Sequence, residues 1–114
     1  MTAATVDLTI EQGATWVYQL TLLTTAGAAF DVTGYTIRMH IREDIRDTTP
    51  LETLTTTDGE IVIATNVVTL SLSATATAAL AFHQAVYDIE MQSAAGVVTR
   101  LMKGTVTISK EVTR

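Results

Sequence analysis

Two histidines and four serines are the side chains that could support metal binding or nucleophilic catalysis. They are His40, His83, Ser71, Ser73, Ser93 and Ser109. None of the serines lies in a G-x-S-x-G or S-x-x-K motif, which position the nucleophile in serine hydrolases. The histidines do not have the H-x-x-x-H or H-E-x-x-H spacing that places two ligands on one metal ion. We therefore expect a protein that is not an enzyme and that has no catalytic residues, no cofactor and no metal site.

The acidic residues provide two further candidate sites. Asp88 and Glu90 lie two residues apart in an alternating segment, so they share a face, and paired carboxylates are what glycosidases use. We expect that face to be solvated, without the apolar surroundings that a general acid needs. The segment Asp58-Gly59-Glu60 lacks the further oxygen ligands of a calcium loop. It is typical of a hairpin turn.

The basic residues are few and are mixed with acids. The chain has 7 Lys and Arg against 12 Asp and Glu, a net charge of −5, which argues against a non-specific phosphate-binding surface. Arg38, Arg42 and Arg46 form the main basic cluster, and acidic residues interleave with it in the segment 43–47. Such a mixture is typical of a solvated face or of the polar rim of a protein interface. We expect no nucleic-acid partner.

Length and composition limit the class of protein. The 114 residues correspond to one domain, 1–114, and 47% hydrophobic with 17% charged residues excludes a disordered chain. The absence of cysteine excludes a disulfide scaffold and a thiolate metal site. The first ten residues do not resemble a secretory signal, and no apolar run approaches the ~20 residues that cross a bilayer. We expect no membrane partner.

Threonine alternates with valine, isoleucine and leucine along most of the chain, and this period of two is typical of half-buried strands. The pattern predicts strands over residues 6–10, 15–22, 35–42, 52–57, 61–63, 68–72, 85–91 and 97–109. Seven or eight short strands, separated by turn signals at spacings of about 8–12 residues, predict an all-β fold. We expect an antiparallel β-sandwich, with an immunoglobulin-like topology as the favoured version.

Four features refine this prediction. Residues 73–80 are rich in alanine and open with a serine, which predicts a short helical turn between strands. Trp16 and Tyr18 are expected to face the core. Tyr87, near the start of the penultimate strand, is a candidate tyrosine corner. Gly104 interrupts the last strand and indicates either a β-bulge or a close approach of another backbone.

One segment carries a family resemblance. Residues 30–39, Phe-Asp-Val-Thr-Gly-Tyr-Thr-Ile-Arg-Met, resemble the DLTG-aromatic segment of small phage and prophage virion proteins, with Val32 where the family often has Leu. The order of other segments fits as well; these are residues 13–15, 69–73, 86–90, 99–106 and 112–114. The sequence is similar to the N-terminal module of phage baseplate upper proteins and to short stand-alone tail-region proteins of prophages.

The resemblance implies a bacteriophage virion structural protein, assembled in the host cytoplasm and docking onto other phage structural proteins. The helical or fibrous extension of baseplate upper proteins is not among these residues, so we expect a tail or baseplate adaptor that forms a homo-oligomer in the particle. The expected interface combines a strand row with the end of the chain: Arg38, His40, Arg42, Lys110 and Arg114. The alternatives are a capsid decoration protein and a carbohydrate-binding or adhesion module.

Overall fold

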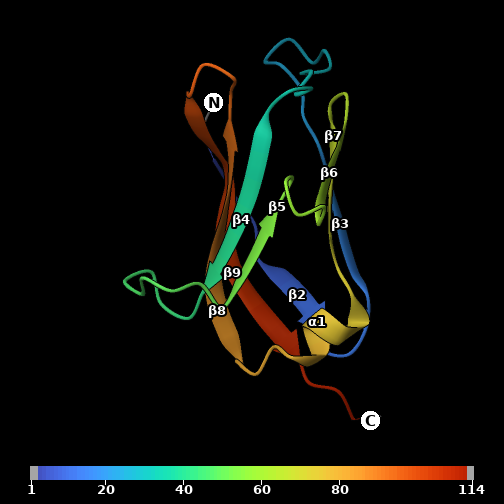
Figure 1. The fold of residues 1–114 in the computed structure, drawn as a ribbon, viewed down its shortest axis with the longest axis vertical. Coiled ribbons are helices and arrows are strands. Elements are labelled where there is room, and N and C mark those ends of the chain that lie inside the picture. Colours follow the sequence, from blue (N-terminus) through green and yellow to red (C-terminus); the bar gives the residue numbers. More distant parts are fainter. Residues whose placement is uncertain (1–2, 113–114) are drawn as a thin grey trace.

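The computed structural model describes residues 3–112. These residues form nine strands, which build two facing sheets, and one short helix (Figure 1). In chain order the elements are β1 (Ala4–Thr5), β2 (Leu8–Glu11), β3 (Trp16–Thr21), β4 (Thr36–Arg42), β5 (Glu52–Thr55), β6 (Ile61–Ala64), β7 (Val67–Leu72), α1 (Ala74–Ala78), β8 (Gln84–Gln92) and β9 (Val98–Ser109). The mostly-β, sandwich-like architecture predicted by the alternation is confirmed, and so is the helical turn within residues 73–80.

The larger sheet has six strands in the order β1-β9-β8-β4-β5, with β2 also paired to β9. The smaller sheet has the order β3-β7-β6 and is antiparallel. The expectation of an entirely antiparallel sandwich is wrong, because β1 and β2 run parallel to β9. The N-terminal segment lies along β9, the last strand of the chain, and extends the sheet at that edge.

All eight predicted segments form strands, and β1 is a ninth that the pattern did not indicate. Ala4 pairs with Met102 and Leu8 with Val106, so β1 and β2 keep one register against β9. They are a single edge strand interrupted at Val6 and Asp7. Two exposed residues without apolar alternation give no periodic signal, which explains why β1 was missed.

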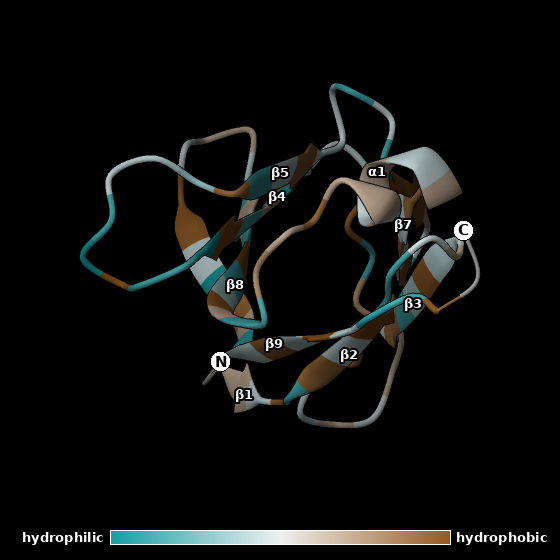
Figure 2. Ribbon diagram, turned by 90° about the horizontal axis from the view of Figure 1, so that it is seen from below, coloured by the Kyte–Doolittle hydropathy of each residue, from teal (hydrophilic) through white to brown (hydrophobic). Residues whose placement is uncertain are grey.

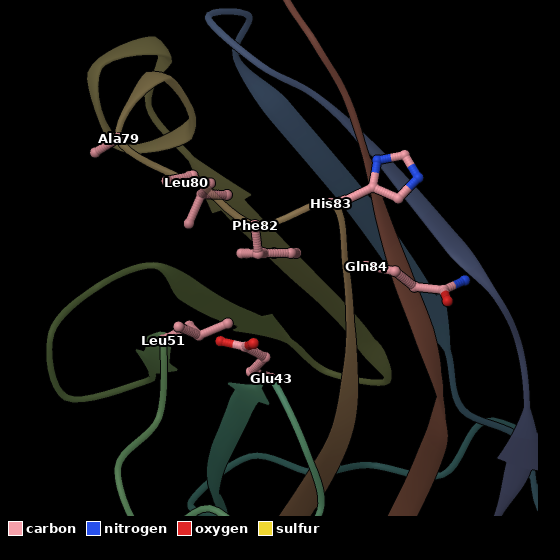
Figure 3. A pocket seen from close by; sticks show the side chains of 8 residues that line it. Glu43, Leu51, Ala79, Leu80, Phe82, His83 and Gln84 are labelled. Atoms are coloured by element: carbon pink, nitrogen blue, oxygen red, sulfur yellow. The ribbon is translucent and has the colours of Figure 1, made fainter.

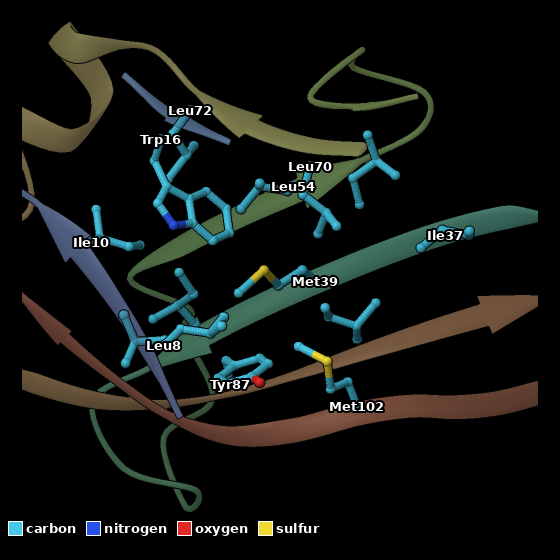
Figure 4. Close-up of a cluster of buried hydrophobic side chains, with 14 of the residues drawn as sticks. Leu8, Ile10, Trp16, Ile37, Met39, Leu54, Leu70, Leu72, Tyr87 and Met102 are labelled. Atoms are coloured by element: carbon cyan, nitrogen blue, oxygen red, sulfur yellow. The ribbon is translucent and has the colours of Figure 1, made fainter. Parts of the chain in front are cut away.

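The core lies between the two sheets, and the strands surround it when the molecule is viewed along its long axis (Figure 2). On β4 every second side chain is fully buried, and on β8 the same alternation holds, as predicted. The buried residues of these two strands are Ile37, Met39, Ile41, Ala85, Tyr87, Ile89 and Met91. They belong to one hydrophobic cluster with Leu70 and Leu72 of β7, and Figure 4 shows Met39 and Tyr87 across the interior from these two leucines.

Trp16 packs into this core, as expected from its place in the alternation. Its side chain is 9% exposed and stacks on the half-buried ring of Tyr18, with centroids 6.2 Å apart and ring planes 7° from parallel. Such stacking adds to the stabilisation that burial of the large ring provides.

The turn at Asp58-Gly59 is not a hairpin, in contrast to the prediction. β5 pairs with β4 in the larger sheet and β6 pairs with β7 in the smaller one, so residues 56–60 carry the chain between sheets. Gly59 has φ of +91°, the left-handed turn geometry that the sequence indicated. The hairpin nearby follows β6, where Thr65 and Asn66 join β6 to β7.

α1 is capped and anchored by side-chain hydrogen bonds. The Ser73 hydroxyl accepts from the Ala76 amide at 3.1 Å, the N-cap that the sequence predicted. Thr77 is fully buried, and its Oγ1 accepts from the Gly13 amide at 3.1 Å and donates to the Ala14 carbonyl at 2.8 Å. This hydroxyl ties the helix to the turn between β2 and β3.

Within the described residues, 3–112, there is no helix with the length and apolar character needed to span a membrane.

Replacing Thr77 with valine keeps the shape of the side chain and removes the hydroxyl. The Gly13 N–H and the Ala14 carbonyl then lose their partner, so we expect the free energy of unfolding to fall by about 2 kcal/mol in urea denaturation. Thr75→Val on the exposed side of the same helix is the matched control and should change it by less than ~0.5 kcal/mol. Equal losses in the two variants would show that helix propensity, not the buried hydroxyl, determines the effect.

β9 contains both features that Gly104 suggested, at different positions. The pairing with β8 shifts between Ile89 and Glu90, which leaves Leu101 without a partner opposite, and Leu101 and Met102 are consecutively buried. The bulge is therefore three residues before the glycine. A Cβ at Gly104 would overlap the backbone carbonyl of Val6, so the close approach of another backbone is confirmed.

Tyr87 binds the same N-terminal segment. Its hydroxyl donates to the Val6 carbonyl oxygen, and the Val6 amide donates to the Lys103 carbonyl at 2.9 Å. Burial of the phenol raises the pKa of Tyr87 far above its usual range, with smaller effects from Tyr18 and Asp7, so the hydroxyl keeps its proton. The prediction of a tyrosine corner is wrong, because the hydroxyl of Tyr87 does not bind the backbone that a tyrosine corner uses. The bond reaches the interrupted edge strand instead of backbone a few residues upstream.

Candidate interaction surface

The outer face of the six-stranded sheet gathers most of the charged strand residues, and we call it the charged face. Arg38, His40 and Arg42 project from β4 as the alternation predicted, because their neighbours in the strand point into the core. Strand pairing places Arg38 beside Glu90 and His40 beside Asp88. It also brings in two cations of β9 that sequence reasoning missed, Arg100 beside Glu90 and Lys103 beside Asp88.

Two ion pairs cross this face. Arg38 donates to Glu90 Oε1 from Nη2 at 3.0 Å and from Nε at 3.2 Å. Arg100 Nε lies 3.5 Å from Asp88 Oδ2. These side chains are 26–50% exposed, so each pair contributes little to stability. The two carboxylates that the sequence singled out therefore serve as partners of arginines on a solvated face.

Arg42 is held by a backbone carbonyl and an imidazole nitrogen. Its Nη1 donates to the Asp47 carbonyl at 2.8 Å, and its Nη2 lies 3.1 Å from His40 Nδ1. Since the guanidinium has only donors, His40 must accept at Nδ1. Neither Arg42 nor Lys103 forms an ion pair within residues 3–112.

An open cavity of about 460 Å³ lies on the charged face, and we call it the basic groove. The charged and aliphatic side chains of its lining are Arg42, Ile45, Val86, Asp88, Arg100 and Lys103. It therefore combines three cations, one carboxylate and two aliphatic side chains. His40 also lines the groove, whereas Arg38 does not.

A second cavity, of about 640 Å³, lies at the end of the sandwich between the β4–β5 loop and the segment joining α1 to β8. Leu51, Leu80 and Phe82 make its lining largely apolar (Figure 3). The imidazole of His83 points away from Glu43, so the two titratable side chains of this cavity do not meet (Figure 3). Among residues 3–112 no three His, Asp or Glu side chains gather in a way that could hold a metal ion.

The structure separates the predicted interface residues. Lys110 does not join the row on β4, because its ammonium group donates to the carbonyls of Ala81 and Phe82, both at 3.0 Å. It therefore stabilises the connector beside the end cavity. Arg114 lies outside the described residues. The row Arg38, His40 and Arg42 is the part of the prediction that forms one surface.

The three-stranded sheet presents a contrasting surface, which we call the uncharged face. β3, β6 and β7 contain no charged residue. Val17 and Val62 point outward, 58% and 57% exposed, and the Gln19 side chain donates to Thr69 Oγ1 at 3.3 Å. The two outer faces of the sandwich thus differ sharply in charge.

No protein-family model matches the sequence, and no curated protein matches it.

Proposed function

We propose that this protein is a bacteriophage virion structural protein, a small non-enzymatic adaptor of the tail or baseplate that docks onto other virion proteins. The resemblance of residues 30–39 to phage virion proteins supports this function. The observation that carries it is the contrast between two broad strand-built faces, one charged and one without any charged residue. A subunit that contacts different neighbours needs distinct surfaces on a rigid body.

The uncharged face suits burial against protein. Charged residues are depleted at the centre of protein interfaces, and exposed Val17 and Val62 supply apolar area there. Because both valines project from paired strands, little side-chain or backbone conformational freedom would be lost on binding. A homo-oligomer within the particle would repeat such contacts and strengthen attachment.

The strand order supports an immunoglobulin-like version of the sandwich, which forms part of the proposal. β4, β8 and β9 correspond in order to strands C, F and G, and β3, β7 and β6 to strands B, E and D. β5 then extends the sheet beside strand C, as in variable-type domains. Domains of this architecture serve widely as binding modules, and their function resides in the exposed surfaces.

The aromatic residues favour a protein partner over a sugar. All six aromatic side chains of the chain lie in the described part, and all are buried or half-buried. A carbohydrate-binding module needs exposed rings on which sugars stack. The capsid decoration protein remains the second candidate function, since the same two faces would serve to join capsid subunits.

Deleting the gene from the phage or prophage that encodes the chain tests this function. We expect particles with defective or missing tails by electron microscopy, and recovery when the wild-type chain is supplied from a plasmid. Intact tails on unstable capsids would assign the chain to the capsid. Normal particles with normal infectivity would contradict a structural role in the virion.

A further inference from the structure

We propose that the basic groove binds an extended acidic segment of a partner polypeptide. This deepens the proposed function, and it rests on that function only for the partner being a virion protein. Its three cations project from paired strands of the charged face, so the backbones that carry them keep their relative positions, and Ile45 comes from the β4–β5 loop.

The charges of the groove lining favour an acidic ligand. The chain as a whole is acidic, with a net charge of −5, yet the groove lining has three cations and one carboxylate. Arg100 is engaged with that carboxylate, Asp88. Arg42 and Lys103 remain without an acidic partner among residues 3–112. Two cations in one groove therefore form no ion pair with a described carboxylate, although Asp88, which is engaged with Arg100, is the strand neighbour of Lys103.

Pre-organisation is the second argument. The Asp47 carbonyl and His40 Nδ1 hold the guanidinium of Arg42 in place, and they leave further donors of its fork available. A carboxylate that binds here would not have to order this side chain. Charge-assisted hydrogen bonds to arginine are among the stronger polar contacts in proteins.

The spacing of the cations indicates an extended ligand. Arg42 is on β4 and Lys103 on β9, with β8 between them. Arg42 pairs with Val86 and Lys103 with Asp88, two residues further along β8, so the two backbones are about 12 Å apart. Val86 provides apolar surface beside Arg42, and Ile45 stands 84% exposed at the rim. A segment with acidic residues on both sides of an aliphatic one matches this order. A compact anion would leave the aliphatic surface uncovered.

Asp88 disfavours a densely charged ligand. Its carboxylate lies in the same lining, beside His40 and Lys103 in the sheet. A polyphosphate or a nucleic-acid backbone would bring repeated charges against it, whereas carboxylates spaced along a peptide can avoid it. Charge complementarity therefore selects an acidic polypeptide as the occupant.

Fluorescence anisotropy with the purified full chain tests this proposal. The probe is a fluorescein-labelled peptide, Gly-Glu-Asp-Val-Glu-Asp-Gly, and the reference is the same peptide with Gln and Asn in place of Glu and Asp. We expect the acidic peptide to bind far more tightly than the amide peptide, and we expect its affinity to fall as the salt concentration rises. Arg42→Gln and Lys103→Gln should each raise Kd about tenfold.

Arg46→Gln is the matched control, because Arg46 lies on the adjoining loop, pairs with Asp44 and does not line the groove. It should change Kd by less than about twofold. Absence of acidic-peptide binding, equal binding of the amide peptide, or an equal effect of Arg46→Gln would overturn the proposal. Stronger binding of single-stranded DNA or inorganic phosphate at the same residues would also overturn it.

This result is separable from the virion role. If the chain binds the acidic peptide but is absent from particles, the peptide-binding proposal holds and the virion function is contradicted. If the chain is present in particles but binds no acidic peptide, the virion function holds and the peptide-binding proposal is contradicted.

Discussion

Replacing Gly104 with alanine is expected to lower the free energy of unfolding by about 3 kcal/mol. The new Cβ would overlap the carbonyl oxygen of Val6, and this is backbone that cannot rotate away. Relief would require the edge strand to move off β9. That movement would break the hydrogen bonds from Tyr87 to Val6 and from Val6 to Lys103. Urea denaturation followed by fluorescence of Trp16 measures the change.

Gly96→Ala separates this clash from the conformational cost of losing a glycine. Gly96 has φ of +91°, and nothing lies within 4 Å of a Cβ placed on it. Only the left-handed backbone then disfavours alanine, at a cost of about 1 kcal/mol. If Gly96→Ala destabilised the protein as much as Gly104→Ala does, the docking of the edge strand against β9 would not be what requires a glycine.

Ile89→Ala is expected to lower the free energy of unfolding by about 3 to 4 kcal/mol. Ile89 is fully buried in β8, which lies between β4 and β9, and its strand partners Met39 and Met102 are buried too. Shortening it leaves a cavity that paired strands on both sides prevent from closing. Denaturant unfolding measures the loss.

Val62→Ala is the comparison for this core truncation. Val62 is also a β-branched strand residue, but it is 57% exposed on the uncharged face, so its removal should cost about 0.5 kcal/mol or less. A similar loss for Ile89→Ala and Val62→Ala would contradict the placement of the core between the two sheets.

The orientation of side chains could be predicted from the sequence wherever the alternation is strict. On β4 and β8 a strict period of two places alternate side chains on opposite faces, and the structure accordingly buries Ile37 and Ile89 and leaves Arg38 on the outer face. Local chemistry was equally sufficient for the helix, because Ser73 caps an alanine-rich segment whatever the rest of the chain does.

Pairing between strands could not be predicted in this way. The parallel addition of β1 and β2 to β9 depends on contacts between residues about a hundred positions apart in the sequence. A period of two within one segment does not indicate which distant strand that segment pairs with. For the same reason the turn at Asp58-Gly59 gave the geometry of a bend but not whether its strands share a sheet.

The candidate site shows the same limit. The row on β4 was accessible from the sequence, whereas Arg100 and Lys103 join it only through the register of β9, which the bulge at Leu101 shifts by one residue. Their outward placement on a strand was the available signal, but it does not say which residues lie beside them. The contacts of Lys110 with two backbone carbonyls likewise depend on how the chain folds back, which its charge alone does not indicate.

Quantitative mass spectrometry of gradient-purified phage particles tests the docking role, since a docking subunit must remain with its assembly. We expect the chain to co-sediment with particles at a low, fixed copy number relative to the major capsid protein. Recovery of the chain solely in the fraction free of particles would contradict it.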